Sequence, residues 1–374
     1  MLRWIRIVAL SLCVLVTLLA LAGALYQAIA THLDASRLPE YGRLVDVGGY
    51  RLMLNCTGVG KPTVILEAGW GDVTVEWRAV QPEIAKFARV CSYDRAGYGG
   101  SDPGPMPRTS LQIATELHTL LRNASEKPPY VLVGSSFGGY NVRLFNGLYP
   151  DEVAGIVLAD ATQEDQYELL PKAWNAISAA MLKHGERLER YSFFVVHLGI
   201  GRLMLRAQGG SDDGAYLILQ SKYLKARTSE LREIRVSAEQ ARVADHISDK
   251  PLIVLTAAEN TDTTLSNGLS KQDFEAFKRI WVDDLQMRLA QLSTRGRRIM
   301  VSRSGHDIPS DRPDSIVNAV HELCSAGDKS TIAPVCCRRV LARDLRREMS
   351  QRAATQSQEP EPMEQKIELR ERAE

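Results

Sequence analysis

The sequence Gly-Ser-Ser-Phe-Gly at residues 134–138 constrains the fold more than any other segment of the chain. The apolar run Tyr130–Val133 precedes it and residues 139–144 have helical character, so we expect a strand, a sharp turn and a helix in succession. A serine on so tight a turn adopts a strained backbone conformation, and the outer glycines leave room for the neighbouring strand and helix. We expect the turn to lift the Ser136 hydroxyl above a sheet, with the N-terminus of the helix directed at the same point.

Strand-like and helical segments alternate along most of the chain. Continuous apolar strands between helices indicate a parallel sheet covered on both faces, and an initial hairpin pattern adds an antiparallel edge. We therefore predict an α/β fold with a mostly parallel eight-stranded sheet. Residues from about 163 to 248 lack strand character, and we predict a helical cap there. The candidate strands are residues 43–47, 50–56, 63–67, 89–93, 130–133, 153–159, 252–256 and 298–301.

The N-terminal segment has the length and composition of a membrane-spanning helix. Residues 7–25 contain no charged side chain, and as a helix they would be about 30 Å long, which matches the hydrocarbon core of a bilayer. Trp4 and Tyr26 flank this run at the depth of the membrane interface. We predict a membrane anchor over residues 1–30, and the small-x-small sequence Ala28–Ala30 leaves a cleaved signal peptide as the alternative.

Both alternatives place the rest of the chain on the same side of the membrane. Arg3 and Arg6 precede the apolar run, and the positive charge there exceeds that just after it, which favours an N-terminus inside. We therefore expect a linker at residues 31–41, followed by a domain at residues 42–324 on the extracytoplasmic side, periplasmic or extracellular.

Composition points to a small-molecule partner rather than a charged polymer. The net charge is +1, so no overall field attracts nucleic acid. The chain has no zinc-type Cys/His spacing and no glycine fingerprint for a dinucleotide or phosphate loop. We expect no metal and no organic cofactor. Residues 325–374 are rich in charge and poor in large apolar side chains, which predicts a flexible, solvated tail.

Six cysteines are spread over the chain. Cys56 and Cys91 fall within candidate strands, where we expect buried thiols that pack as small hydrophobic side chains. An oxidising compartment would permit disulfides, but the spacing of the cysteines assigns none.

A serine hydroxyl becomes a nucleophile when a base accepts its proton and an acid orients that base. His306 fits the base, because it lies in a loop after the last candidate strand and follows the small residues Ser304 and Gly305. For the acid we favour Asp160, at the end of the strand 153–159, because a strand end holds a carboxylate firmly. Asp262 is the alternative acid and Glu259 a weaker third candidate; both lie in the loop after the strand at 252–256.

The negative oxygen that forms during attack on a carbonyl needs two preorganised donors. One should be the backbone N–H of Phe137, the residue after the nucleophile. The second should come from the loop after the third strand, where Gly69 and Gly71 flank Trp70, and we choose the N–H of Trp70. The glycine-rich loop at residues 94–101 lacks the spacing of a nucleotide site, and we interpret it as a structural loop beneath these residues.

Together these residues resemble the α/β-hydrolase superfamily over residues 41–324. Residues 94–102, Asp-Arg-Ala-Gly-Tyr-Gly-Gly-Ser-Asp, are similar to the DRxGxGxSD stretch of its haloalkane dehalogenase, epoxide hydrolase and proline iminopeptidase-like branches. Val64–Trp70 looks like their strand leading to the oxyanion turn, although Ala68 and Ser135 stand where histidine is usual. The N-terminal pattern resembles that of membrane-anchored bacterial hydrolases.

The resemblance implies acyl transfer to water, since Ser136 stands where dehalogenases and epoxide hydrolases have an aspartate. Some dehalogenase-like members carry their acid after the strand that Asp160 ends, which supports Asp160. The resulting hypothesis is a membrane-anchored serine hydrolase that cleaves a carboxylic ester of a small molecule. A peptidase or amidase with the same triad is one alternative, and a catalytically silent binding protein on a hydrolase scaffold is another.

Overall fold

The computed structural model describes residues 1–35, 42–207, 215–244, 247–259 and 268–327. Its centre is an eight-stranded sheet in the order β1-β2-β4-β3-β5-β6-β7-β8. The β1–β2 and β2–β4 pairs are antiparallel and the other pairs are parallel. The predicted α/β fold with a mostly parallel sheet is therefore confirmed. The strands are β1 (Arg43–Asp46), β2 (Arg51–Thr57), β3 (Thr63–Glu67), β4 (Val90–Tyr93), β5 (Tyr130–Ser135), β6 (Val153–Ala159), β7 (Leu252–Ala257) and β8 (Gly296–Val301).

Helices cover both faces of this sheet. The helices α3 (Ser110–Asn123), α4 (Gly138–Leu148) and α10 (Ile234–Val243) pack against one another, and α4 lies on β3, β5 and β6. On the other face α15 (Pro313–Gly327) contacts β5, β6 and β7. Alternate residues of the parallel strands point to α15 and form the main core, because side chains alternate between the faces of a strand. These core residues are Val64, Leu66, Val131, Val133, Val157, Ala159, Ile253, Leu255, Ile316 and Val320.

Short helices complete the layer beside α15. The 3₁₀ turn η2 (Thr74–Ala79) and α2 (Gln81–Ile84) follow β3, and α14 (Ile308–Asp311) follows β8. Between β7 and β8 the chain forms α12 (Lys271–Arg279), the π-helical turn η5 (Ile280–Leu285) and α13 (Gln286–Gln291).

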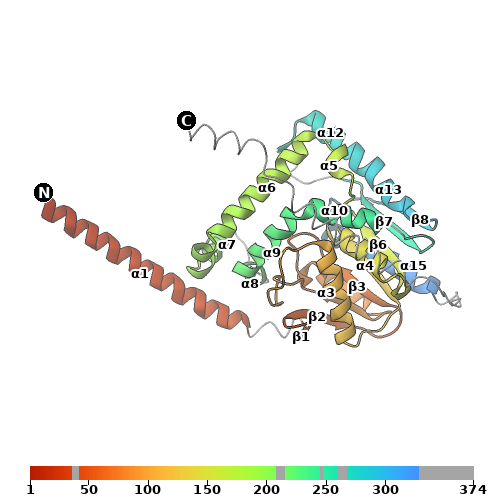
Figure 1. Cartoon of the computed structure of the whole chain (residues 1–374), viewed down its shortest axis with the longest axis horizontal. Coiled ribbons are helices and arrows are strands. Elements are labelled where there is room, and N and C mark those ends of the chain that lie inside the picture. The colour runs from red at the N-terminus through yellow and green to blue at the C-terminus, as the bar shows by residue number, and fades with distance from the viewer. Residues whose placement is uncertain (36–41, 208–214, 245–246, 260–267, 328–374) are drawn as a thin grey trace, which may run out of the picture. The chain divides into compact units, whose positions relative to one another are not determined.

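The described residues between β6 and β7, where we predicted the cap, are helical (Figure 1). Part of this segment, residues 208–214 and 245–246, lies outside the described residues. The helix α10, which is the last helix of this segment, packs on α3 and α4 and so joins the cap to the sheet domain. The cap elements are α5 (Gln166–Leu169), α6 (Lys172–Arg190), the π-helical turn η4 (Phe193–His197), α7 (Ile200–Ala207), α8 (Ala215–Ile218), α9 (Ser221–Arg232) and α10.

A disulfide joins Cys56 of β2 to Cys91 of β4, so the expectation of two buried thiols is wrong. The two residues lie directly opposite each other in the antiparallel pair, with their Cα atoms 4.1 Å apart. Closely spaced pairs of this kind bring Cβ atoms within bonding reach of a disulfide. The bond fastens the antiparallel edge of the sheet to its parallel part.

The N-terminal helix α1 (Leu2–Ala35) is long and apolar enough to cross a membrane. It covers residues 2–30 of the predicted anchor and continues five residues into the predicted linker, to Ala35. The extension has a physical cause, since Asp34 in this last turn forms an ion pair with Arg202 of the cap. Residues 36–41, and residues 328–374 of the predicted tail, lie outside the described residues.

Candidate active site

The predicted turn at Ser136 forms between β5 and α4. Ser136 has a φ of +48°, a conformation that L-residues rarely adopt. A Cβ atom at Gly134 would lie 2.7 Å from Val142 Cγ2, and one at Gly138 would lie 2.5 Å from the carbonyl oxygen of Glu67. Only glycine fits at either position, so the strand and the helix approach closely enough to hold the serine in its strained conformation.

His306 connects Ser136 to Asp160. Its Nε2 lies 2.9 Å from Ser136 Oγ, and its Nδ1 lies 2.7 Å from Asp160 Oδ2. The three side chains come from the ends of β5, β6 and β8, which meet at one edge of the sheet because these strands are parallel. A carboxylate only accepts hydrogen bonds, so in neutral His306 Nδ1 carries the proton and the lone pair of Nε2 accepts the hydrogen bond of the serine hydroxyl.

Two further groups donate hydrogen bonds to the Asp160 carboxylate besides His306. Its Oδ1 accepts the N–H of Ala257 at 3.1 Å, and its Oδ2 also accepts the indole N–H of Trp281 at 3.0 Å. The carboxylate is 3% exposed, and three donors fix it in the plane needed to orient the imidazole. Like Ser136, Asp160 has a positive φ, of +41°.

Trp281 was missed by sequence reasoning. It lies in η5, and π-helical turns of this kind are frequent at functional sites because they redirect a side chain from a helix. An indole within an otherwise helical segment gives no sequence signal for this role.

Of the other two candidate acids, the structure describes only Glu259, and its carboxylate binds elsewhere. Asp262 lies outside the described residues. Glu259 Oε1 accepts the backbone N–H of Arg303 at 3.1 Å, and its own backbone N–H donates to Ser304. Glu259 therefore supports the loop that carries His306.

Arg95 lies beneath the loop that carries Trp70. Its guanidinium donates to the carbonyl oxygens of Ala68 and Gly69, both at 2.8 Å. The remaining donors bind Glu67 at 3.1 Å and, in bidentate fashion, Glu230 of the cap at 2.9 and 3.1 Å.

All five N–H groups of Arg95 are therefore used. Burial opposes its charge, but Glu230 and Glu67 hold the pKa of Arg95 well above its usual range. The loop interpreted from the sequence as structural thus supports the turn at Ala68 and Gly69 directly.

Trp70 and Phe137 both line the cavity at Ser136. Over the part of the chain that the structure describes, neither backbone N–H is taken by a carbonyl group. Arg227 fixes the indole of Trp70. The indole N–H donates to the carbonyl of Arg227 at 2.9 Å, and the Arg227 guanidinium lies 4.0 Å from the ring centre.

The cavity above Ser136 has a volume of about 320 Å³. Two carboxyl side chains from the segment after β3, Asp72 and Glu76, lie at one side of it. Desolvation raises the pKa of Asp72, with Arg95 opposing the shift, and desolvation together with Asp72 raises the pKa of Glu76 well above its usual value. Apolar residues form most of the remaining wall: Trp70, Phe137, Tyr167, Trp174, Ile177, Met181, Leu231, Ile234, Phe277 and Trp281.

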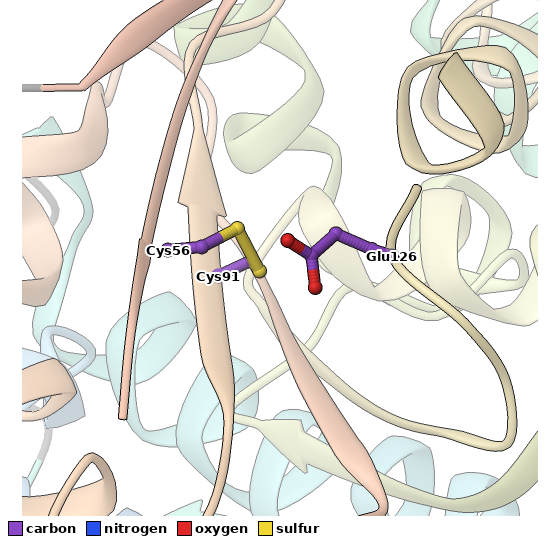
Figure 2. A group of neighbouring side chains, drawn as sticks. All are labelled: Cys56, Cys91 and Glu126. Carbon is purple, nitrogen blue, oxygen red and sulfur yellow. A yellow bond between two sulfur atoms is a disulfide. The ribbon is translucent and has the colours of Figure 1, made fainter. Parts of the chain in front are cut away.

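Among the described residues, the group with the spacing of a metal site lies elsewhere. Figure 2 shows Cys56, Cys91 and Glu126, whose ligand atoms lie within 4.8 Å of one another. Both sulfur atoms are joined in the disulfide and so do not offer thiolates. The Glu126 carboxylate binds Arg89, with contacts of 2.7 and 3.2 Å.

Comparison with known proteins agrees with this fold. The family model described as "alpha/beta hydrolase fold" matches residues 62–196, the segment from β3 through the Ser136 turn into the cap. Over this segment the chain resembles α/β-hydrolases, and its eight-stranded sheet has the fold of that superfamily. A thermophilic esterase from Thermogutta terrifontis has a similar structure, with a TM-score of 0.55 and 20% identity, covering 76% of this chain and 98% of that one.

Curated relatives match the chain to different extents. An "AB hydrolase superfamily protein" of Gibberella zeae is 26% identical over 282 residues, covering 70% of this chain and 86% of that protein. The "Probable transporter efuK" of Hormonema carpetanum is 32% identical over 136 residues, which is 34% of this chain. The chain spans only 20% of that protein's length, and 51% of the length of another relative, YbdG of Bacillus subtilis.

Proposed function

We propose that this protein is a membrane-anchored serine hydrolase that cleaves a carboxylic ester through an acyl-enzyme. One observation carries the proposal: a continuous hydrogen-bonded chain runs from Ser136 Oγ through His306 to Asp160, with contacts of 2.9 and 2.7 Å. This is the arrangement that activates a serine hydroxyl at neutral pH.

The reaction follows from the positions of the protons. Ser136 Oγ attacks the acyl carbon while its proton passes to His306 Nε2, and Asp160 stabilises the imidazolium that results. His306 then gives this proton to the leaving alkoxide, which departs as the alcohol and leaves the acyl group on Ser136. A water molecule, deprotonated by His306, attacks the acyl-enzyme and releases the acid.

The contacts of Arg95 support Trp70 and Phe137 as the oxyanion donors. The peptide bond between Gly69 and Trp70 is trans, so its C=O and N–H point in opposite directions. Because Arg95 holds the Gly69 carbonyl at 2.8 Å, the Trp70 N–H is aimed away from Arg95. With the N–H of Phe137, which follows the nucleophile, it offers two preorganised donors to the tetrahedral intermediate.

The cavity favours a small acyl substrate with an apolar body. Its aromatic and aliphatic wall suits a hydrocarbon acyl chain or ring. Asp72 supports a second candidate, an aminopeptidase or amidase, since a carboxylate within reach of the cavity would hold the ammonium group of an aminoacyl substrate. Selectivity between ester and anilide substrates separates the two.

The disulfide supports the proposed location outside the cytoplasm. Disulfides form and persist in oxidising compartments, and Cys56–Cys91 lies in the domain that follows α1. With α1 as an anchor, the hydrolase domain would face the periplasm or the exterior.

The test is labelling of the full chain in detergent micelles by a fluorophosphonate, followed by mapping of the adduct by mass spectrometry. We expect the adduct on Ser136, and we expect Ser136→Ala to lose both the adduct and the hydrolysis of p-nitrophenyl butyrate. Ser325→Ala, which alters an exposed serine on α15, is the matched control and should leave both unchanged. Ordinary turnover in Ser136→Ala, or a mapped adduct elsewhere, would reject the assignment.

The role of the acid is tested separately. Asp160→Asn should lower kcat by about 10⁴-fold because it leaves the imidazole in the wrong tautomer. Asp262→Asn should leave kcat near its original value. A large loss in the second variant alone would assign the acid to Asp262.

A further inference from the structure

The cap helix α7 presents an apolar stripe on its outer side. Ile200, Leu203 and Met204 follow the i, i+3, i+4 spacing of one helix face, and they are 38%, 55% and 58% exposed. Arg202, between them in sequence, is only 5% exposed and faces inward. The helix therefore covers Arg202 and leaves three hydrocarbon side chains uncovered, which is the reverse of a surface helix in water.

The covered side of α7 packs against α1. Arg202 donates to Gln27 Oε1 at 3.1 Å and forms an ion pair with Asp34. Gln27 is 8% exposed, so this contact shields polar groups of both helices. Arg206, one turn further along α7, lies 5.8 Å from the ring centre of Tyr26.

Two glycines bring the backbones of these elements into direct contact. A Cβ atom at Gly23 of α1 would lie 2.5 Å from the carbonyl oxygen of Leu198, and one at Gly199 would lie 2.9 Å from Tyr26 Cδ1. Gly199 itself has a φ of +68° and forms the turn that starts α7. The start of α7 is thus fixed beside Gly23 and Tyr26.

This contact sets the depth of α7 relative to a bilayer. The apolar run of α1 ends at Leu25, so Gly23 lies about 3 Å inside its end, at 1.5 Å per residue. Leu198 touches Gly23 and Ile200 follows two residues later, which places the start of α7 level with the end of the span. The polar partners Gln27 and Asp34 lie on the water side of this level.

We propose that α7 lies in the membrane interface, with Ile200, Leu203 and Met204 in contact with the acyl chains of the bilayer that α1 spans. The proposal rests on the membrane anchoring in the proposed function and on the contacts between α1 and the cap. Tyr191 and Phe194, which precede α7, are 51% and 54% exposed, and aromatic side chains favour the same interface. Helices that combine an apolar face with arginine bind membranes in this way.

The test places a fluorescent probe at single cysteines of the full chain reconstituted in phosphatidylcholine–phosphatidylglycerol vesicles. The background replaces Cys13, Cys324, Cys336 and Cys337 by alanine and keeps the disulfide. Leu203→Cys and Met204→Cys carry an NBD label, and Val59→Cys, at a position 84% exposed between β2 and β3, is the matched control. Lipid-borne nitroxides and aqueous iodide serve as the two quenchers.

We expect the labels at positions 203 and 204 to be quenched several-fold more by the lipid nitroxide than by iodide, with a blue-shifted emission, and the label at 59 to show the opposite. A background that retains only Cys13, in the middle of α1, reports on the anchor itself. If the label at Cys13 is quenched by the lipid nitroxide while the labels at positions 203 and 204 are quenched by iodide, the proposal for α7 is overturned and the anchor is retained.

Two other outcomes also overturn the proposal. Iodide quenching at Cys13 removes the anchor on which it rests, whereas fluorophosphonate labelling of Ser136 in the same vesicles still tests the hydrolase assignment. The labels at positions 203 and 204 could also be protected from both quenchers and quench each other. If this self-quenching disappears when unlabelled chain is added, a second copy of the chain covers this face of α7.

Discussion

Replacing Arg95 by lysine should slow catalysis while leaving substrate affinity nearly unchanged. The five N–H groups of Arg95 make five hydrogen bonds, to Glu67, to Glu230 and to the two carbonyl groups that precede Trp70. A lysine ammonium has three donors and no planar fork. At least two acceptors therefore lose their partner, and a single ammonium does not hold both carbonyls and both carboxylates.

The size of the effect follows from these contacts. If the Gly69 carbonyl is released, the Trp70 N–H is no longer fixed toward the substrate, and loss of one oxyanion donor costs about 10²–10³ in kcat. An interaction made only with the tetrahedral intermediate changes kcat and not KM. Partial loss of a buried ion pair should also lower the free energy of unfolding by about 3–5 kcal/mol.

The assay is steady-state hydrolysis of p-nitrophenyl butyrate, together with inhibition by a boronic acid, which forms a tetrahedral anion on the serine. Arg95→Lys should lower kcat and the affinity for the boronate by similar factors, with KM within about threefold. Arg89→Lys is the matched control, because Arg89 also pairs with a carboxylate, that of Glu126, but at the disulfide edge of the sheet. We expect its kcat to be unchanged.

A folded Arg95→Lys variant with kcat within about threefold of the original would refute this reasoning. If the variant does not fold, Glu230→Gln provides a second test. It leaves Arg95 and both of its carbonyl contacts in place but removes the charge of the cap carboxylate that pairs with the guanidinium. It should lower kcat by less than Arg95→Lys, with KM again retained.

Other consequences of the structure can be measured directly. Trp281→Phe removes one hydrogen bond to the Asp160 carboxylate and should lower kcat/KM at least about tenfold, the value of a bond to a charged group; an unchanged rate would show that the indole does not orient the acid. Replacing Cys56 and Cys91 by serine opens a link between residues 35 apart in sequence and should lower the free energy of unfolding by about 3–4 kcal/mol, measured in guanidinium with and without reductant. Because desolvation raises the pKa of Glu76, the folded chain retains a proton that the unfolded chain releases as the pH rises above 4.5, and stability falls with rising pH. Glu76→Gln should therefore unfold at higher denaturant concentration than the original chain at pH 8, with the gain vanishing at pH 4 or below; equal midpoints at pH 8 would contradict this.

The Ser136 turn could be predicted because its constraint is local. The glycines at 134 and 138 are required by atoms of the adjoining strand and helix. Asp160 and His306 could be placed because Asp160 directly follows a strand and His306 lies in the loop after the last strand, and the carboxyl ends of parallel strands meet at one edge. The hydrogen bonds among the three residues agree with that expectation.

Contacts between distant segments could not be predicted from the same patterns. The Cys56–Cys91 bond depends on β2 lying beside β4, which cysteine spacing does not encode. Arg95 lies 135 residues from Glu230, and its role appears only when the cap has folded over the loop at Gly69. Trp281 reaches Asp160 because of a π-helical turn, and apolar periodicity does not distinguish such a turn from an α-helix.

The ion pair between Arg202 and Asp34 has a practical consequence for anyone who shortens this chain to obtain a soluble enzyme. Deleting the first 35 residues would remove both Gln27 and Asp34, the partners of Arg202, and would expose to water the side of α7 that α1 covers. The cap would lose the contact that holds α7, and α6, which leads into η4 and α7, supplies Trp174 and Ile177 to the cavity wall. Substrate preferences recorded on the trimmed enzyme would then describe a reshaped pocket, and ligand screening belongs on protein that keeps its N-terminal helix.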